Sequence, residues 1–379
     1  MSQLQFRSDD TIQWQEGYGS RADGDSSPSG THSAPNTTFT GTEDAITGTV
    51  GDNTGFAIGD IVLIHQSRNG GDGAGVWQLN KIIGISSTTF TFKYKLTNDY
   101  ATTAQILEIN QNKNITVTGT LTAAAWDGSK GGIVALLGES IDVSGSIVTT
   151  GKGYRGGQQT TGSGASYYTY QGEGTAGAGT QSDAANGNGG GGGRSRASGG
   201  TGGHSSSGVD GNMGNSGAGV VGKGGSTAGN ADLTVMVFGG GGGPGGTTGG
   251  GDPNNGIGHG GPGGGITILI GKNITITGSV LNSGVIGSNG GGSDYGGGSA
   301  GAGGSALLKG EVLILGSNLV TALGVSATAT GDAATPATPS SAGRIHADYK
   351  ISISGSTNPT IDSRQDDSLN DVSSFLMFL

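Results

Sequence analysis

The carboxylates on the predicted β-strands are the residues whose type and spacing could support hydrolytic chemistry. Cleavage of a glycosidic bond needs two Asp or Glu side chains that face each other across a groove. Four carboxylates lie on repeated strand-like segments: Glu139, Asp142, Glu311 and Asp348. In the second copy of the repeat, Lys272 and Thr275 stand where the first copy has Glu139 and Asp142. We therefore expect these carboxylates to lie on the solvated face of the strands. No enzymatic activity is predicted, and a polysaccharide hydrolase is the alternative.

The residues that could hold a metal ion or a cofactor form no recognisable motif. None of the histidines is spaced as a metal-binding pair, and we expect them to lie at the surface or in packing positions: His32, His65, His204, His259 and His346. Asp23 and Asp25 could meet a calcium ion, but a turn explains them equally well. GxGxxG patterns occur by chance in a chain this rich in glycine, and none lies in a βαβ unit. The sequence predicts neither a metal nor a cofactor.

Tyrosine and arginine side chains embedded in glycine-rich sequence are the remaining candidates for a binding site. Tyr154 and Arg155 lie in KGYRGG, and Tyr167, Tyr168 and Tyr170 follow in SYYTYQGEG. Tyrosine offers a large contact area at a low cost in conformational entropy. Aromatic and arginine side chains also dominate the binding energy of many interfaces. We predict a recognition surface for a sugar or a protein at this segment. Packing of the tyrosines against glycine-rich chain is an alternative of equal weight.

Composition excludes several classes of protein. The chain has 379 residues, of which 85 are glycine, with a net charge of −10 and no cysteine. Its 18 lysine and arginine residues are scattered, so no basic patch indicates binding to nucleic acid. No apolar run approaches the roughly 20 residues that a membrane-spanning helix needs. A strict Gly-X-Y period, which collagen requires, is also absent. The N-terminal sequence lacks the basic and apolar segments of a standard secretion signal.

Glycine-rich tracts of this length are ordinarily flexible linkers, because glycine loses the most backbone freedom on folding. Extended glycine segments in the polyproline II conformation have three residues per turn and point their N–H and C=O groups outward. Such segments can lie side by side and satisfy one another's backbone groups. We therefore predict polyproline II inserts at residues 152–263, 285–302 and 326–342.

An internal repeat predicts the body of the fold. Residues 131–151 align without gaps on residues 264–284. The alignment places three glycines on three others, and we expect all six at equivalent bends: Gly132, Gly138 and Gly145 on Gly265, Gly271 and Gly278. Partial copies occur at 114–121, 303–324 and 343–356. One such unit cannot bury its own apolar face, so the units must stack, as in a β-solenoid.

These patterns predict an all-β chain with essentially no helix. Residues 1–40 form an attachment or linker segment, or else lie along the body of the chain. Residues 41–111 form a small antiparallel β domain, a barrel or a sandwich of about five strands. Residues 112–356 form the β-repeat body with its glycine-rich inserts, where 232–238 adds a further strand, and 357–379 form a C-terminal tail. We expect the apolar end, Phe375–Leu379, to dock on the chain or on a partner.

Alternation of apolar β repeats with polyglycine inserts resembles two groups of proteins. One is the glycine-rich adhesin tip of T-even-type phage tail fibres. The other is a diffuse set of phage and bacterial glycine-rich repeat proteins, which the segment WDGSKGGIVALL resembles. The resemblance implies a virion tail fibre or adhesin that attaches to a host cell-surface protein or glycan and joins other tail subunits, as a homo-oligomer. A bacterial surface or matrix fibre protein and a tailspike depolymerase are the alternatives. No functional residue carries over from either group.

Overall fold

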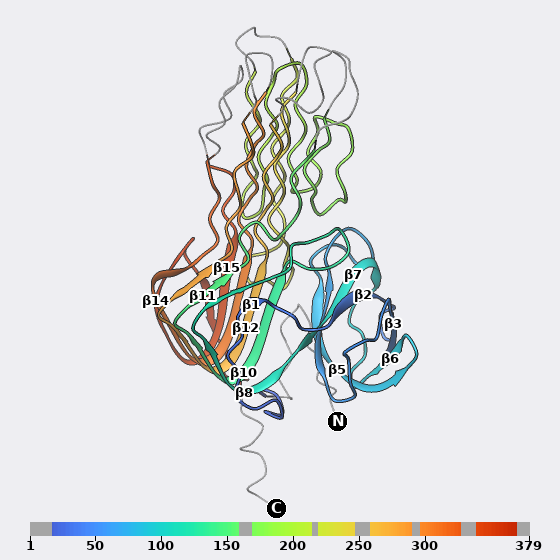
Figure 1. The fold of residues 1–379 in the computed structure, drawn as a ribbon, viewed down its shortest axis with the longest axis vertical. Helices are drawn as coiled ribbons and strands as arrows, with labels where there is room; N and C mark the ends of the chain where they lie inside the picture. Colours follow the sequence, from blue (N-terminus) through green and yellow to red (C-terminus); the bar gives the residue numbers. More distant parts are fainter. Residues whose placement is uncertain are drawn as a thin grey trace, which may run out of the picture.

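The computed structural model describes residues 17–158, 169–213, 219–246, 258–289, 296–326 and 339–369. Within these ranges the chain is all-β and contains no helix, so none is long and apolar enough to cross a membrane. Figure 1 shows three parts: a barrel, a curved sheet beside it, and long irregular segments that extend from one end of the sheet. All three parts come from one chain whose glycine-rich segments leave the sheet and return to it.

The barrel occupies the N-terminal part of the chain and is closed by six antiparallel strands. In spatial order they are β2 (Asn36–Gly41), β3 (Thr47–Val50), β6 (Thr89–Phe92), β5 (Trp77–Ser86), β4 (Ile61–Gln66) and β7 (Tyr100–Ile109). Phe39, Phe90 and Phe92 fill its interior in edge-to-face pairs. Alternation of aromatic and polar residues along β6 therefore predicted the inward face correctly. Of the two expected forms, a barrel or a sandwich, the structure has the barrel.

The second sheet is parallel and contains the internal repeat. Its strands are β1 (Gly30–Thr31), β8 (Gln111–Val117), β9 (Thr120–Thr122), β10 (Ile133–Val143), β11 (Ser146–Val148), β12 (Ile266–Ile276), β13 (Ser279–Leu281), β14 (Ser305–Thr321), β15 (Arg344–Asn358) and β16 (Asp362–Gln365). Ile133 pairs with Ile266 and Val143 with Ile276, which is the register of the gap-free sequence alignment. The partial copies pair in order on either side. The repeat is thus the stacking unit of the sheet.

Three units have a long strand and a short strand, namely β8 with β9, β10 with β11 and β12 with β13, whereas β14 and β15 each continue as one strand along both sides. The two sides enclose a common apolar core. Ile141 and Ile274 on the long strands face Ile147 and Val280 on the short ones in one cluster. Only these two sides of a unit are strands, because the chain then enters glycine-rich sequence. The units therefore stack in parallel and in register, but a complete solenoid coil is not shown.

The repeat glycines do not share one role. Gly145 and Gly278 lie at the bends between long and short strands, where an added Cβ would overlap the carbonyl oxygens of Gly119 and Gly145, respectively. Gly132 has a φ of 80° and precedes the long strand, as does Gly265. Gly138 and Gly271 pair with each other inside the long strands. This last pair lies within continuous strands, where an added Cβ would press on the side chain of Ile115 at Gly138 and of Ile141 at Gly271.

The N-terminal segment lies along the edge of the parallel sheet. Ser26 N–H donates to Asn114 O at 2.8 Å, and Thr116 N–H donates to Ser26 O at 2.9 Å. Thr31 in β1 pairs with Thr122 in β9. Residues 17–32 therefore pack on the body of the protein, which is the second of the two alternatives for this segment. The expected C-terminal docking segment, Phe375–Leu379, lies outside the described residues.

The described glycine-rich residues between β11 and β12 and between β13 and β14 form what we call the glycine bundle. Its central segment, Gly239–Gly246, donates hydrogen bonds with a period of three. One neighbour accepts from every third residue, with Gly239, Gly242 and Gly245 donating to the carbonyls of Gly264, Gly261 and Gly258 at 2.9 Å each. A second neighbour does the same, with Gly240, Gly243 and Gly246 donating to Gly203, Gly200 and Ala197. Gly241 donates to Glu173 O at 3.0 Å, in a third direction.

The carbonyl groups of this central segment accept hydrogen bonds from three further neighbouring segments. They accept from Ala302 and Ser299, from Gly190 and Gly193, and from Gly157. Side chains at the glycine positions would overlap the surrounding backbone, since a Cβ on Gly242 would meet the carbonyl of Ser299. Absence of side chains therefore lets six chain segments approach one another closely enough for backbone bonding on all sides.

Residues 232–238 join the bundle to the other two parts. They form no strand, so the expectation of an extra strand was wrong. Instead Leu233, Met236 and Phe238 insert into a cluster with barrel and sheet side chains. Trp77 Nε1–H donates to Leu233 O at 2.9 Å. His65 Nε2–H donates to Met236 O at 2.8 Å.

Candidate binding groove

A groove of about 620 Å³ lies where the glycine bundle meets the start of the parallel sheet. Its volume falls within the range of ordinary small-ligand sites. Glycine backbone makes up much of the wall, at Gly151, Gly153, Gly156, Gly157, Gly179 and Gly260. The side chains in the wall are few and include Trp126, Arg155, Tyr170, Glu173 and Pro262.

The floor of the groove is fixed by aromatic packing. Trp126 is 2% exposed, and its ring lies 5.4 Å from that of Phe238. Tyr154, just before the groove residue Arg155, is fully buried against Phe238 and donates its hydroxyl proton to Ser67 O at 2.6 Å. Because Ser67 follows β4 of the barrel, this bond ties the groove to the barrel.

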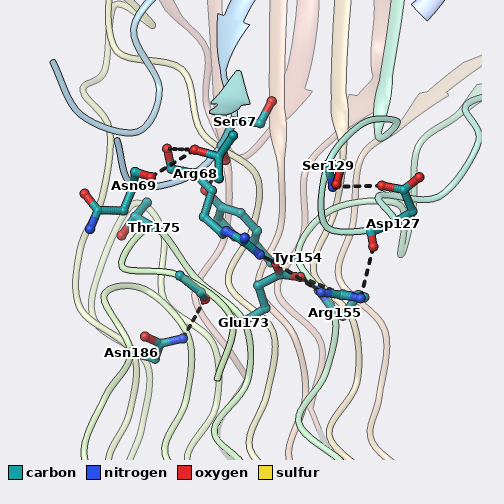
Figure 2. Close-up of polar contacts among 12 residues, drawn as sticks. Ser67, Arg68, Asn69, Asp127, Ser129, Tyr154, Arg155, Glu173, Thr175 and Asn186 are labelled. Atoms are coloured by element: carbon teal, nitrogen blue, oxygen red, sulfur yellow. Dashed lines mark hydrogen bonds and ion pairs between the residues drawn. The ribbon is translucent and has the colours of Figure 1, made fainter. Parts of the chain in front are cut away.

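Glu173 is the buried acid of the groove, with a side chain only 3% exposed. Arg68 Nη1 lies 2.6 Å from one carboxylate oxygen and Arg155 Nε lies 2.9 Å from the other (Figure 2). Burial alone raises the pKa of Glu173, but hydrogen bonds from Arg155 and Arg68, together with the nearby Trp126 indole, outweigh burial and lower it. The Trp126 indole N–H nevertheless makes no hydrogen bond of normal geometry. Glu173 is therefore a fixed anion that connects the barrel, the groove and the bundle.

Arg155 holds its guanidinium in the groove wall with three kinds of contact. Besides Nε, Nη1 donates to Asp127 O at 3.0 Å and Nη2 makes a long contact of 3.4 Å with Glu173 Oε1. The hydrogen bond to Glu173 is the main reason that the pKa of Arg155 is raised. The side chain is 50% exposed. A guanidinium held in this way is a preorganised cationic donor.

Tyr170 supplies the exposed aromatic surface of the groove. The residue is 41% exposed, while its backbone N–H donates to Gln158 O at 3.1 Å. The next residue, Gln171, has its amide committed to Ala184 O and to Thr180. The backbone under Tyr170 is therefore held in place, and its ring is available to a ligand.

The structure separates the predicted recognition residues. Arg155 and Tyr170 share the groove wall. Tyr154 was expected at the recognition surface, but it is inaccessible, because its ring packs in the cluster that joins barrel and bundle. Tyr167 and Tyr168 lie outside the described residues. Sequence reasoning missed Trp126 and Glu173, which lie far from each other in sequence and meet only through the glycine bundle.

The carboxylates expected on the solvated face divide into two groups. Asp142 is exposed and Glu139 is half-buried. Glu311 and Asp348 are buried, contrary to expectation. Asp348 is enclosed by Lys309, Arg364 and His346, at 2.6, 2.8 and 3.2 Å. Burial opposes ionisation, but His346 and Lys309 outweigh it and hold the pKa of Asp348 well below its usual range.

Burial shifts the pKa of two histidines and one glutamate away from their usual values, and two aspartates near the N-terminus accept hydrogen bonds. Burial lowers the pKa of His65 to about 4 and that of His204 to about 3. Burial, followed by the charges of Asp60 and Asp23, raises the pKa of Glu108 to about 7. Asp23 accepts from Gln111 N–H at 2.6 Å and Asp25 from the Asn114 amide at 2.8 Å, so both carboxylates hold the N-terminal segment on β8. Among the described residues, no group of three or more His, Asp or Glu side chains comes together that could hold a metal ion.

Comparisons with known proteins give no family. No protein-family model matches the sequence, and no curated protein matches it. Among solved structures, the chain is similar to the Gp54 tailspike of Acinetobacter baumannii bacteriophage AP22, which was solved in complex with an A. baumannii capsular saccharide. The TM-score is 0.20 and the identity 11%, over 31% of this chain and 23% of the tailspike. A likeness this distant indicates neither the fold nor the function of this chain.

Proposed function

We propose that this chain is a receptor-binding component of a phage tail, a fibre or adhesin subunit that attaches to a glycan or protein on the host surface. The groove carries the proposal. It presents an exposed tyrosine and a fixed arginine on a wall of hydrogen-bonded backbone. A site whose parts are already fixed loses little entropy on binding.

The glycine bundle gives the groove its rigidity. Three residues per turn is the period of polyproline II, and the bonding pattern around Gly239–Gly246 supports that conformation for the bundle. In a homo-oligomeric fibre, such a bundle would hold the groove wall in one fixed arrangement.

Attachment without cleavage is the form of binding that the groove favours. Glycoside hydrolysis needs a second carboxylate across from the first. Glu173 is the one carboxylate among the described groove residues, and two arginines hold it ionised. A depolymerase would need a proton donor that this wall does not supply.

Binding of the purified chain to bacterial cells tests the proposal. Fluorescently labelled protein is incubated with a panel of capsulated and non-capsulated strains and measured by flow cytometry. We expect saturable labelling of particular strains and no release of reducing sugar from their polysaccharides. Failure to label any strain, with immunogold localising the chain to a bacterial matrix, would instead support the bacterial fibre protein.

A further inference from the structure

The buried carboxylate of Glu173 is shared by two cationic side chains. One carboxylate meets two guanidinium groups, from Arg68 on the barrel side and Arg155 on the groove side. Arg68 makes the shorter contact, at 2.6 Å, and its side chain is only 18% exposed. Glu173 is thus largely compensated from behind the groove. Arg155 therefore shares Glu173 with Arg68, lies within the field of the Asp127 carboxylate, and keeps half of its side chain exposed.

Arg155 also has hydrogen-bonding capacity left over. A guanidinium has five N–H donors. Nε, Nη1 and Nη2 each direct one donor at Glu173 or at Asp127 O. Oδ1 of the nearby Asp127 carboxylate accepts from the N–H groups of Ser129 and Lys130, at 2.7 and 2.9 Å. Two N–H donors of a half-exposed guanidinium therefore remain for an anion that enters the groove.

The rest of the groove suits a sugar ring better than a nucleic acid or a folded protein surface. Tyr170 and Pro262 offer apolar surface on a wall made mainly of glycine backbone. Arg155 is the one cation in that wall among the described residues, too few for the phosphates of a nucleic acid. The volume of about 620 Å³ accommodates a short oligosaccharide but not a folded protein surface.

We infer that the groove binds an acidic saccharide, with the sugar carboxylate on Arg155 and a sugar ring against Tyr170. This inference rests on the proposed attachment function and adds the chemical class of its ligand. A charge-assisted bond from a preorganised arginine fixes the acidic residue of the glycan. The aromatic contact adds area without requiring one particular neighbouring sugar.

The test compares matched acidic and neutral ligands. Surface oligosaccharides from the strains that the chain labels are divided, and one half has its uronic acid groups reduced to neutral hexoses. Both halves are titrated against the full chain by calorimetry. We expect binding to fall by about tenfold or more on reduction, because a charged hydrogen bond is lost. Phosphorylated saccharides keep their charge on reduction, so retained binding by them identifies phosphate as the anion instead and overturns the carboxylate assignment.

Variants separate recognition from packing. Arg155→Gln should weaken binding of the acidic ligand about tenfold or more, and Arg155→Lys should recover part of that loss. Tyr170→Ala should weaken binding of acidic and neutral ligands alike. Lys223→Gln removes a cation whose ion pair with Asp210 is exposed and outside the groove, and it serves as the matched control. Melting temperatures of all variants show whether each one is folded.

Two results would overturn the inference. One is equal binding of reduced and unreduced oligosaccharides. The other is full affinity in folded Arg155→Gln. If the chain labels cells but binds none of their oligosaccharides, the acidic-saccharide inference fails and a protein receptor remains under the proposed function. If the chain labels no cells at all, the proposed function fails with it.

Discussion

The parallel sheet and the glycine bundle are built on opposite principles within one chain. In the sheet, apolar side chains such as Ile141 and Ile274 fill a core between long and short strands. In the bundle, Gly239–Gly246 is surrounded by six segments that hold it by backbone hydrogen bonds. Burial of apolar side chains stabilises the sheet, whereas the lack of side chains on glycine allows the backbone segments of the bundle to approach and hydrogen-bond. The groove lies where the two regions meet, with a floor of buried aromatic rings and a wall made mainly of glycine backbone.

The largest effect is expected where side chains join the two regions. Phe238→Ala removes a fully buried ring that contacts Trp126, Tyr154 and His65. We expect a loss of about 3–5 kcal/mol in the free energy of unfolding, the usual cost of deleting a core aromatic. Chemical denaturation measures it. A loss in the free energy of unfolding of under about 1 kcal/mol would show that the bundle does not depend on the packing of Phe238.

Inside the bundle a single methyl group should be nearly as damaging. Gly242→Ala places a Cβ on the carbonyl of Ser299, so the segments must separate. We expect a loss of about 3 kcal/mol, at the upper end of the usual cost of overpacking. Gly119→Ala is the control, because the nearest atom to its added Cβ is 3.7 Å away. Equal stability of the two variants would contradict the close backbone approach.

The ion pairs between barrel and bundle should give a smaller effect that depends on pH. The pKa of Glu173 is lowered in the folded protein, so its stabilisation is present above its unfolded pKa and is lost as the pH falls through the folded value. Glu173→Gln should cost about 1–3 kcal/mol at pH 7. Its melting temperature should approach that of the wild type between pH 5 and pH 3. A constant difference over that range would place the stabilisation elsewhere.

The smallest effect concerns Glu108, and its sign is the reverse. Its folded pKa is raised to about 7, so the folded state is penalised as the pH rises from the unfolded value toward 7. Glu108→Gln should therefore be more stable than the wild type at pH 8, by less than about 1 kcal/mol because the group is half-exposed. The two proteins should have equal melting temperatures at pH 4. Thermal melts at the two pH values measure the difference.

The sequence predicts the barrel and the parallel sheet well, because the spacing of their apolar residues indicates which positions face the core and which pair between strands. The gap-free alignment of 131–151 on 264–284 is the strand pairing itself. Aromatic alternation likewise predicted the barrel interior. Burial of Asp348 was not predictable, because its partners Lys309 and Arg364 are brought beside it by parallel pairing of separate strands.

Sequence predicts the bundle far less well, since glycine carries no side chain to show which segment it will meet. The polyproline II hypothesis implied hydrogen bonds with a period of three residues, but it did not indicate which six segments would surround Gly239–Gly246. The segment with Leu233, Met236 and Phe238 was expected to be a strand, but these side chains pack in the apolar cluster that joins the barrel, the sheet and the bundle. Burial of Tyr154 and the meeting of Arg155 with Glu173 depend on that same joint. In this chain the glycine-rich sequence is compatible with a bundle but does not indicate which side chains the bundle brings together.

Amide hydrogen exchange of the folded chain tests most directly the claim that backbone hydrogen bonds hold the bundle. Mass spectrometry or NMR would compare Gly239–Gly246 with β12, Ile266–Ile276, in the same sample. Their N–H groups, Pro244 excepted, should be protected to a degree comparable with β12, because each N–H named above has a carbonyl partner within 3.2 Å. Exchange of Gly239–Gly246 at the rate of an unstructured chain, while β12 stays protected, would contradict this.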